Sequence, residues 1–125
     1  MPKVVHFEIP AKDPEKVTQF YRDAFNWKIE KWGKESYWIA YAGPKGEEGI
    51  NGAIYKKDWM DKTVNTIEVD DLDKYMTKIK NSGGKIVKEP KVIPHVGRIA
   101  YGEDPEGNMF GVLESAEDMD TNMKM

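Results

Sequence analysis

The sequence predicts an α+β fold made of two successive modules, each with one strand, one helix and three further strands. The first module opens with Lys3–Ile9, where side chains alternate between two faces as they do along a strand. The same order of elements returns in the second half, and Gly52 and Gly111 mark a repeat of 59 residues. A pair of ferredoxin-like units is the rival architecture, but three strands after the first helix disfavour it.

The first helix is predicted to start at Asp13, because an acidic cap followed by proline and glutamate is typical of a helix N-terminus. Its expected apolar face consists of Val17, Phe20, Tyr21 and Ala24. Three strands are expected after this helix, over Trp27–Trp32, Ser36–Ala42 and Ile50–Lys56.

The second module is predicted to begin with a strand over Thr63–Val69, followed by a helix capped by Asp70 and Asp71. Leu72, Met76 and Ile79 share the apolar face of that helix, and Gly83 and Gly84 follow its end. The remaining strands are expected over Lys85–Lys88, Gly97–Gly102 and Asn108–Glu114.

Length and composition limit the possible classes of protein. The 125 residues predict a single domain over 1–115, with module one at 3–56, a linker at 57–62, module two at 63–114 and a flexible tail at 116–125. The absence of cysteine fits a cytoplasmic location and excludes a thiolate metal site. A net charge of −3 with interspersed signs favours neither nucleic acid nor a membrane as partner.

Four segments together resemble the vicinal oxygen chelate superfamily, the group of glyoxalase I, bleomycin-resistance proteins, extradiol dioxygenases and fosfomycin-resistance enzymes. These segments are HFEIP, DPEKVTQFYRDAFNWKIE, VDDLDKYMTKIKNSGGK and DPEGNMFG. The resemblance extends over residues 3–114. It implies two βαβββ modules that form one curled mixed sheet around a central cavity, in a homodimer. It does not select an activity, because the superfamily includes lyases, isomerases, dioxygenases and binding proteins.

The resemblance also implies four metal-ligand positions, and only one of them holds a donor side chain here. His6 falls on the first position, and Val64 falls on its counterpart, which a one-residue slip would replace by Asn65. The two carboxylate positions fall on Gly52 and Gly111. A lone imidazole does not hold a divalent metal against water, so we expect neither a metal nor another cofactor. The glycines would leave free volume in the cavity, or would mark a bulge where the sheet bends.

Strand alternation predicts which polar side chains share the cavity face. His6 and Glu8 face together in the first strand, and Thr66 and Glu68 face together in the fifth. A carboxylate beside an imidazole can support acid–base chemistry. The alternative is that both glutamates are solvated or ion-paired, and that His6 is a hydrogen-bonded cavity residue.

Two further residues complete the predicted ligand-binding set. Arg98 can bind an anionic group in the cavity, or it is an exposed strand arginine. Trp38 can stack on a planar ligand, with packing in the core or at an interface as the alternative.

The leading hypothesis is a metal-free protein that binds a small organic molecule in its central cavity through these residues: His6, Glu8, Trp38, Gly52, Thr66, Glu68, Arg98 and Gly111. No catalytic residue is assigned under this hypothesis. The alternative is a glyoxalase-like lyase or isomerase that uses His6 in an atypical metal site or in an acid–base pair with Glu8 or Glu68. A third hypothesis is a dimeric interaction module with a vestigial cavity.

Overall fold

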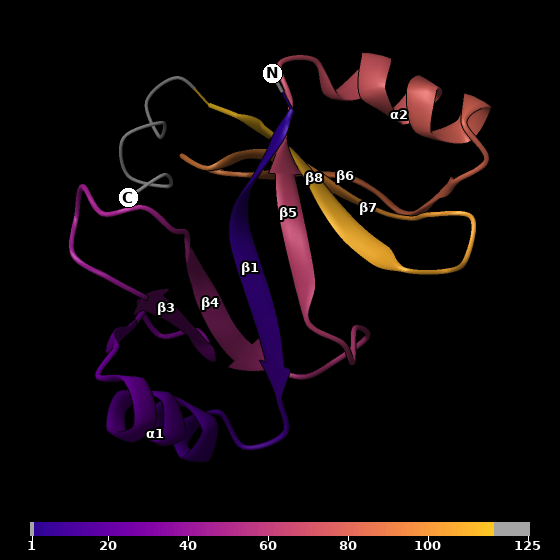
Figure 1. Ribbon diagram of the computed structural model, residues 1–125. Coiled ribbons are helices and arrows are strands. Elements are labelled where there is room, and N and C mark those ends of the chain that lie inside the picture. Colours follow the sequence, from indigo (N-terminus) through magenta and orange to yellow (C-terminus); the bar gives the residue numbers. More distant parts are fainter. Residues whose placement is uncertain (1, 117–125) are drawn as a thin grey trace. The chain divides into compact units, whose positions relative to one another are not determined.

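A computed structural model describes residues 2–116 of the chain (Figure 1). The described residues divide into two compact units. One spans His6–Thr63, and the other takes in the described residues from Val64 onward together with those before His6. The predicted flexible tail lies outside the described residues, except for Ala116. Within the described part of the chain, no helix is long and apolar enough to cross a membrane.

Module one has the predicted order of strand, helix and three strands. Its elements are β1 (Lys3–Ala11), α1 (Pro14–Phe25), β2 (Lys28–Lys31), β3 (Tyr37–Tyr41) and β4 (Asn51–Lys56). The strands lie in the order β2-β3-β4-β1, with β1 parallel to β4 and the other pairs antiparallel.

Module two repeats this organisation. Its elements are β5 (Val64–Glu68), α2 (Leu72–Asn81), β6 (Lys85–Ile93), β7 (Gly97–Glu103) and β8 (Met109–Ser115). The strands lie in the order β5-β8-β7-β6, with β5 parallel to β8. Strand β6 is longer than predicted and pairs irregularly with β7. It contains Pro90, which is tolerated because β6 is the last strand in this order. The α+β fold class with two βαβββ modules is confirmed.

Helix α1 begins at the predicted cap, and only Val17 and Tyr21 of its expected apolar face pack against the core. The carboxylate of Asp13 accepts a hydrogen bond from the Lys16 backbone N–H at 3.3 Å. Phe20 is 56% exposed, so the prediction that it faces the core is wrong. Thr18 is buried in its place, because its hydroxyl donates to the Glu15 carbonyl and so remains satisfied away from water.

Each module has an apolar core between its helix and one face of its strands. In module one the buried residues of this core are Ala11, Ile29, Ala40 and Ile54, with Val17 and Tyr21 of α1 packed against them. In module two they are Val69, Leu72, Met76, Ala100 and Val112, with Ile79 packed against them. The predicted apolar face of α2 is therefore confirmed.

Candidate functional site

The strands of module one present a polar face on the side opposite α1. Paired residues of neighbouring strands point to the same side of a sheet, and β1 pairs His6 with Asn51 and Glu8 with Ala53. Strand β3 continues this face, since Ile39 pairs with Ala53. We call it the His6 face, and its central residues are His6, Glu8, Tyr37, Ile39, Asn51, Ala53 and Tyr55.

His6 lies on this face as a buried, neutral imidazole. The residue is 8% exposed, and its Nε2 atom has no hydrogen-bond partner. Burial lowers the pKa of His6 to about 4, because a charged imidazolium is poorly solvated there. A buried polar atom without a partner is costly to the fold, so Nε2 is available to hydrogen-bond a bound molecule.

Glu8 lies further along the same face, close to two tyrosines. It is 8% exposed. Burial, and then the negative charge of Glu8, raise the pKa of Tyr37 and of Tyr55 above the ordinary value for a phenol. The two rings are 6.4 Å apart between centroids, and the Tyr55 hydroxyl is buried without a partner. Both phenols therefore stay protonated at neutral pH and can donate a hydrogen bond.

Tyr37, Tyr55 and Asn51 are residues of this face that sequence reasoning did not select. Asn51 lies beside His6 in the β1–β4 register, and its side-chain oxygen accepts the Ala42 backbone N–H at 3.0 Å. Tyr37 and Trp38 are adjacent in β3, so strand alternation places their side chains on opposite faces of the sheet. It did not indicate which of them lies with His6.

Gly52 does not lie on the His6 face. It pairs with Phe7, on the side of the sheet that α1 covers. A methyl group built on Gly52 would overlap the Phe7 ring, at less than 3.0 Å from its carbons. The predicted role of Gly52 as a cavity residue is therefore wrong. The glycine allows the aromatic ring to pack against the backbone of β4.

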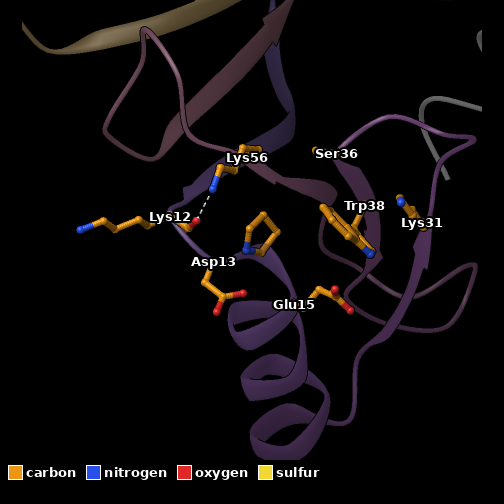
Figure 2. A pocket seen from close by; sticks show the side chains of 8 residues that line it. Lys12, Asp13, Glu15, Lys31, Ser36, Trp38 and Lys56 are labelled. Atoms are coloured by element: carbon orange, nitrogen blue, oxygen red, sulfur yellow. Dashed lines mark hydrogen bonds between the residues drawn. The ribbon is translucent and has the colours of Figure 1, made fainter.

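Trp38 also lies on the helix-covered side, where it pairs with Ile54 and packs against the core of module one. It lines a surface hollow of about 590 Å³ together with Lys12, Asp13, Pro14, Glu15, Lys31, Ser36 and Lys56 (Figure 2). The ammonium of Lys31 lies 5.5 Å from the Trp38 ring centroid. Trp38 therefore does not join the residues of the His6 face, contrary to the expectation of a shared cavity.

In module two, the face opposite α2 carries Thr66, Glu68 and Gly111. Thr66 pairs with Gly111 across β5 and β8, and it is 1% exposed with no hydrogen-bond partner for its hydroxyl. A methyl group built on Gly111 would lie 3.1 Å from that hydroxyl and 3.3 Å from the Tyr101 ring. Gly111 thus lies under these two side chains, and the expected free volume is absent. Glu68 accepts a hydrogen bond from the Ser115 hydroxyl at 2.6 Å.

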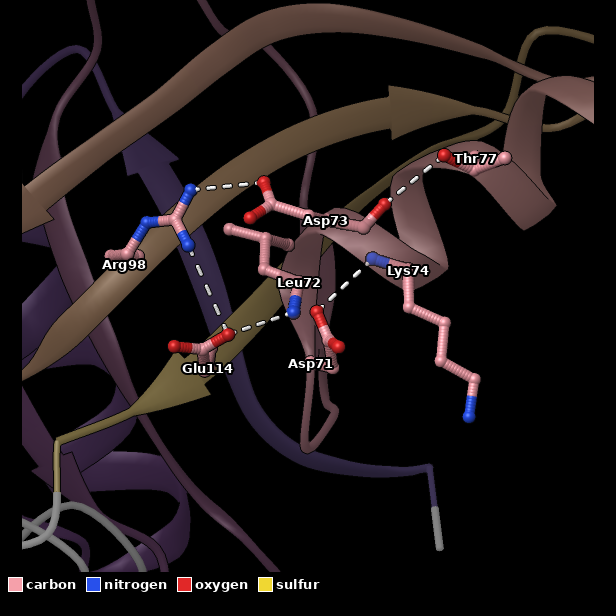
Figure 3. Close-up of polar contacts among 7 residues, drawn as sticks. All are labelled: Asp71, Leu72, Asp73, Lys74, Thr77, Arg98 and Glu114. Carbon is pink, nitrogen blue, oxygen red and sulfur yellow. Dashed lines mark hydrogen bonds and ion pairs between the residues drawn. The ribbon is translucent and has the colours of Figure 1, made fainter.

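Arg98 binds acidic groups of its own module. Its guanidinium contacts Asp73 of α2 at 3.2 Å and Glu114 of β8 at 3.9 Å (Figure 3). The hydrogen bond to Asp73 is the main reason that the pKa of Arg98 is raised. Glu114 also accepts the backbone N–H of Leu72, the first residue of α2, at 2.8 Å. The predicted role in binding an anion inside the cavity is therefore wrong, because Arg98 joins β7 and β8 to the start of α2.

Comparison with known proteins identifies the family of the chain. A model of the Glyoxalase/Bleomycin resistance protein/Dioxygenase superfamily matches residues 3–112. The chain belongs to this superfamily. The resemblance inferred from the four sequence segments is confirmed.

Proteins that are similar to this chain in sequence carry several different descriptions. A glyoxylase-like domain-containing protein of Didymella fabae is 29% identical over 84% of this chain and 88% of its own length. A probable lactoylglutathione lyase of Synechocystis is 25% identical over 94% of this chain and 98% of its own length. A candidate glyoxylase of Mycobacterium bovis is 46% identical over 48 residues, and the chain spans only 18% of that protein's length.

Solved structures confirm the fold at low sequence identity. A hypothetical protein of Bacillus halodurans superposes with a TM-score of 0.67 at 15% identity, over 93% of this chain and 96% of its own. A Streptomyces coelicolor methylmalonyl-CoA epimerase variant in complex with 2-nitronate-propionyl-CoA superposes with a TM-score of 0.63 at 15% identity, over 92% of this chain and 95% of its own.

The metal that many superfamily members hold does not fit the donor groups of this chain. Among the described residues, no group of three or more histidine, cysteine or acidic side chains is placed to hold a metal ion. Beside His6 lies Asn51, whose oxygen already accepts a backbone N–H, and beside Thr66 lies Gly111. A divalent cation needs three or four protein donors, and the His6 imidazole beside these neutral groups supplies one.

Proposed function

We propose that this superfamily member binds a small organic molecule on its His6 face, without a metal. The observation that supports the proposal best is the pair of buried, unpartnered polar atoms on one face, His6 Nε2 and the Tyr55 hydroxyl. Native proteins rarely leave such atoms unsatisfied, because each costs about 1–3 kcal/mol. A ligand that hydrogen-bonds both atoms recovers this energy on binding.

The spacing and surroundings of these atoms suit a molecule of modest size. Asn51, the partner of His6, and Tyr55 are four residues apart on β4, which corresponds to about 13 Å along a strand. Ile39 and the fully buried Ala53 lie between the two ends, and the Tyr37 ring lies beside Tyr55. An apolar middle with polar groups at both ends is the usual composition of a small-molecule site.

Acid–base catalysis by His6, the alternative function, is less well supported by the chemistry of the face. An efficient general base has a pKa near the working pH, and burial lowers the pKa of His6 to about 4. The two phenols have raised pKa values, so they are weak acids. His6 and the two phenols are therefore better suited to hydrogen-bonding a ligand than to transferring protons at neutral pH.

A fragment screen read by tryptophan fluorescence and thermal shift tests the binding proposal. The ring centroids of Trp32 and Tyr37 are 5.5 Å apart, so a ligand bound on the His6 face is expected to change tryptophan emission. Tyr55→Phe removes only the hydroxyl and should weaken the hits by about tenfold, as expected for a lost buried hydrogen bond. Tyr75→Phe, the same change on α2, is the matched control and should leave affinity unchanged. Hits that are insensitive to Tyr55→Phe and His6→Ala would contradict the proposal.

Metal analysis separates the binding proposal from the metal-dependent alternative. Protein purified without chelators should contain metal far below one equivalent, and added nickel, zinc or manganese should not raise its melting temperature. Near-stoichiometric metal that is lost in His6→Ala would establish a metal site instead.

We also infer a cytoplasmic homodimer. The superfamily resemblance implies the dimer, and the lack of cysteine suits a reducing compartment. Light scattering coupled to size exclusion measures the oligomeric state, and a monomer at micromolar concentration would contradict the inference.

A further inference from the structure

A second candidate site is the hollow beside Trp38, on the opposite side of the module-one strands from the His6 face (Figure 2). Its lining comes from the start of α1, from Trp38 of β3 and from Lys56 at the end of β4, among others. The volume of about 590 Å³ lies within the range of about 300–1,000 Å³ that small-molecule sites have. The hollow is therefore large enough for a molecule of one or two rings, and it shares no lining residue with the His6 face.

Trp38 gives the hollow a fixed aromatic surface. The side chain is half-buried and packs against the core of module one, so its orientation is set before any ligand binds. The buried Pro14 belongs to the same lining. A flat aromatic ring stacks on an indole held in this way at little cost in side-chain entropy.

Lysines outnumber the acidic residues of this lining. Lys12, Lys31 and Lys56 carry ammonium groups, whereas Asp13 and Glu15 carry carboxylates. The Asp13 carboxylate accepts a backbone hydrogen bond as the cap of α1. The ionised lining therefore has one net positive charge, which favours an anion over a cation.

The ammonium of Lys56 is held in place at the end of β4. Its Nζ atom donates a hydrogen bond to the Lys12 carbonyl at 2.7 Å (Figure 2). A lysine ammonium has three N–H donors, so two remain to bind an anionic oxygen. The hydrogen bond also restricts a side chain that would otherwise lose rotamer freedom when a ligand binds. Lys56 is thus the best-placed group of the lining to bind an anion.

We propose that this hollow binds a small aromatic anion, a carboxylate or phosphate group on a flat ring system. The ring stacks on Trp38, and the anionic oxygens accept hydrogen bonds from the Lys56 ammonium. Glu15 limits the affinity, because its carboxylate repels the ligand. The inference goes beyond the proposed function, since it assigns a second ligand to the other side of the module-one strands.

A matched set of naphthalene derivatives tests the class of ligand. Naphthoate, naphthyl phosphate, naphthol and naphthylmethylamine, all substituted at the same ring position, share the ring system and differ in charge. Affinities are measured by calorimetry at neutral pH and low salt. Both anions should bind at least about fivefold more tightly than the naphthol, and the amine should bind most weakly. The tighter of the two anions identifies the preferred anionic group.

Two changes of charge assign the binding to the hollow. Lys56→Gln should weaken the binding of both anions by about fivefold or more, because it removes the ammonium that binds them. Glu15→Gln should strengthen their binding by about threefold, because it removes the carboxylate that repels them. Lys57→Gln is the matched control for Lys56→Gln. It removes the same charge one residue later, outside the lining, and should leave the affinity unchanged.

Trp38→Phe tests the aromatic surface. Phenylalanine keeps a ring in the core of module one and offers a smaller face, so both anions should bind about threefold more weakly. Trp27→Phe is the matched control, because Trp27 packs against the same core but lies outside the lining. It should leave the affinity unchanged.

The opposite outcomes overturn the inference. Naphthol or the amine binding as tightly as the anions would contradict the preference for negative charge. Equal losses in Lys56→Gln and Lys57→Gln would show that the net charge of the protein, and not the hollow, attracts the anions. Unchanged affinity in Glu15→Gln would contradict the position of the anionic group. If none of the four compounds binds at millimolar concentration, the inference fails, and the proposal for the His6 face is unaffected.

Discussion

Modules one and two have the same order of strands, yet the polar groups that face away from their helices differ. The parallel pairs correspond, since His6 lies beside Asn51 in module one and Thr66 lies beside Gly111 in module two. Module one combines an imidazole with a buried carboxylate and two phenols. In module two the corresponding pair is a hydroxyl and a glycine. The same framework therefore carries an imidazole and a buried carboxylate in one module, and a closely packed hydroxyl and glycine at the corresponding pair of the other.

Acid sensitivity is the largest effect expected from this difference. The unfolded chain binds a proton at a histidine pKa near 6.5, whereas folded His6 has a pKa of about 4, so the unfolded state holds more protons between these values. The free energy of unfolding should fall by about 3 kcal/mol from this group as pH falls from 6.5 to 4. Urea denaturation across this range measures it.

His6→Gln should flatten that pH dependence, and His95→Gln, at the exposed turn between β6 and β7, should preserve it. If the free energy of unfolding depends on pH equally in the wild-type protein and in His6→Gln, His6 does not cause the loss of stability in acid.

The two glycines offer a second contrast, with a smaller expected effect. Gly52→Ala places a methyl group in the Phe7 ring and should destabilise the protein by about 2–3 kcal/mol, as overpacking does. Gly111→Ala meets Thr66 and Tyr101 at 3.1 and 3.3 Å, where slight shifts suffice, so its cost should be about 1 kcal/mol. Chemical denaturation compares the two variants.

A smaller side chain in place of the Phe7 ring should rescue Gly52→Ala and should not rescue Gly111→Ala. In a double-mutant cycle, Phe7→Leu should recover part of the stability lost in Gly52→Ala. Additive effects of the two changes would mean that Phe7 does not fill the space beside Gly52.

Two buried threonines provide the smallest contrast. Thr66→Val in module two removes an unpartnered hydroxyl with little change in shape and should stabilise the protein by about 1 kcal/mol. Thr18→Val in module one removes a hydroxyl that donates to Glu15 at 3.0 Å and should destabilise by about 1 kcal/mol. Opposite signs in thermal unfolding support this account, whereas a destabilising Thr66→Val would show that its hydroxyl has a partner in solution.

The sequence predicted the features that depend on neighbouring residues. Asp13 and Asp71 were identified as caps because a capping carboxylate accepts a hydrogen bond from a backbone N–H only three residues ahead. The repeat of elements was visible because turn residues and alternation recur in the same order. Both features are local, so no knowledge of strand pairing was needed.

Site residues were harder to predict because their faces depend on strand register. Gly52 is separated from β1 by more than 40 residues, and a shift of one position moves it from the His6 face to the helix-covered face. Arg98 was placed on the wrong face for the same reason, since its partners lie on α2 and β8. Alternation places Trp38 and Tyr37 on opposite faces of β3, but it does not indicate which of these faces α1 covers.

The contact between Glu114 and the Leu72 backbone N–H has a consequence for how module two assembles. The first amide of α2 finds its acceptor 42 positions later in the chain, at the end of β8. An isolated helix would leave this amide exposed to water. Its hydrogen-exchange protection therefore reports whether the last strand has docked, and α2 reaches its complete native form only after β8 is in place.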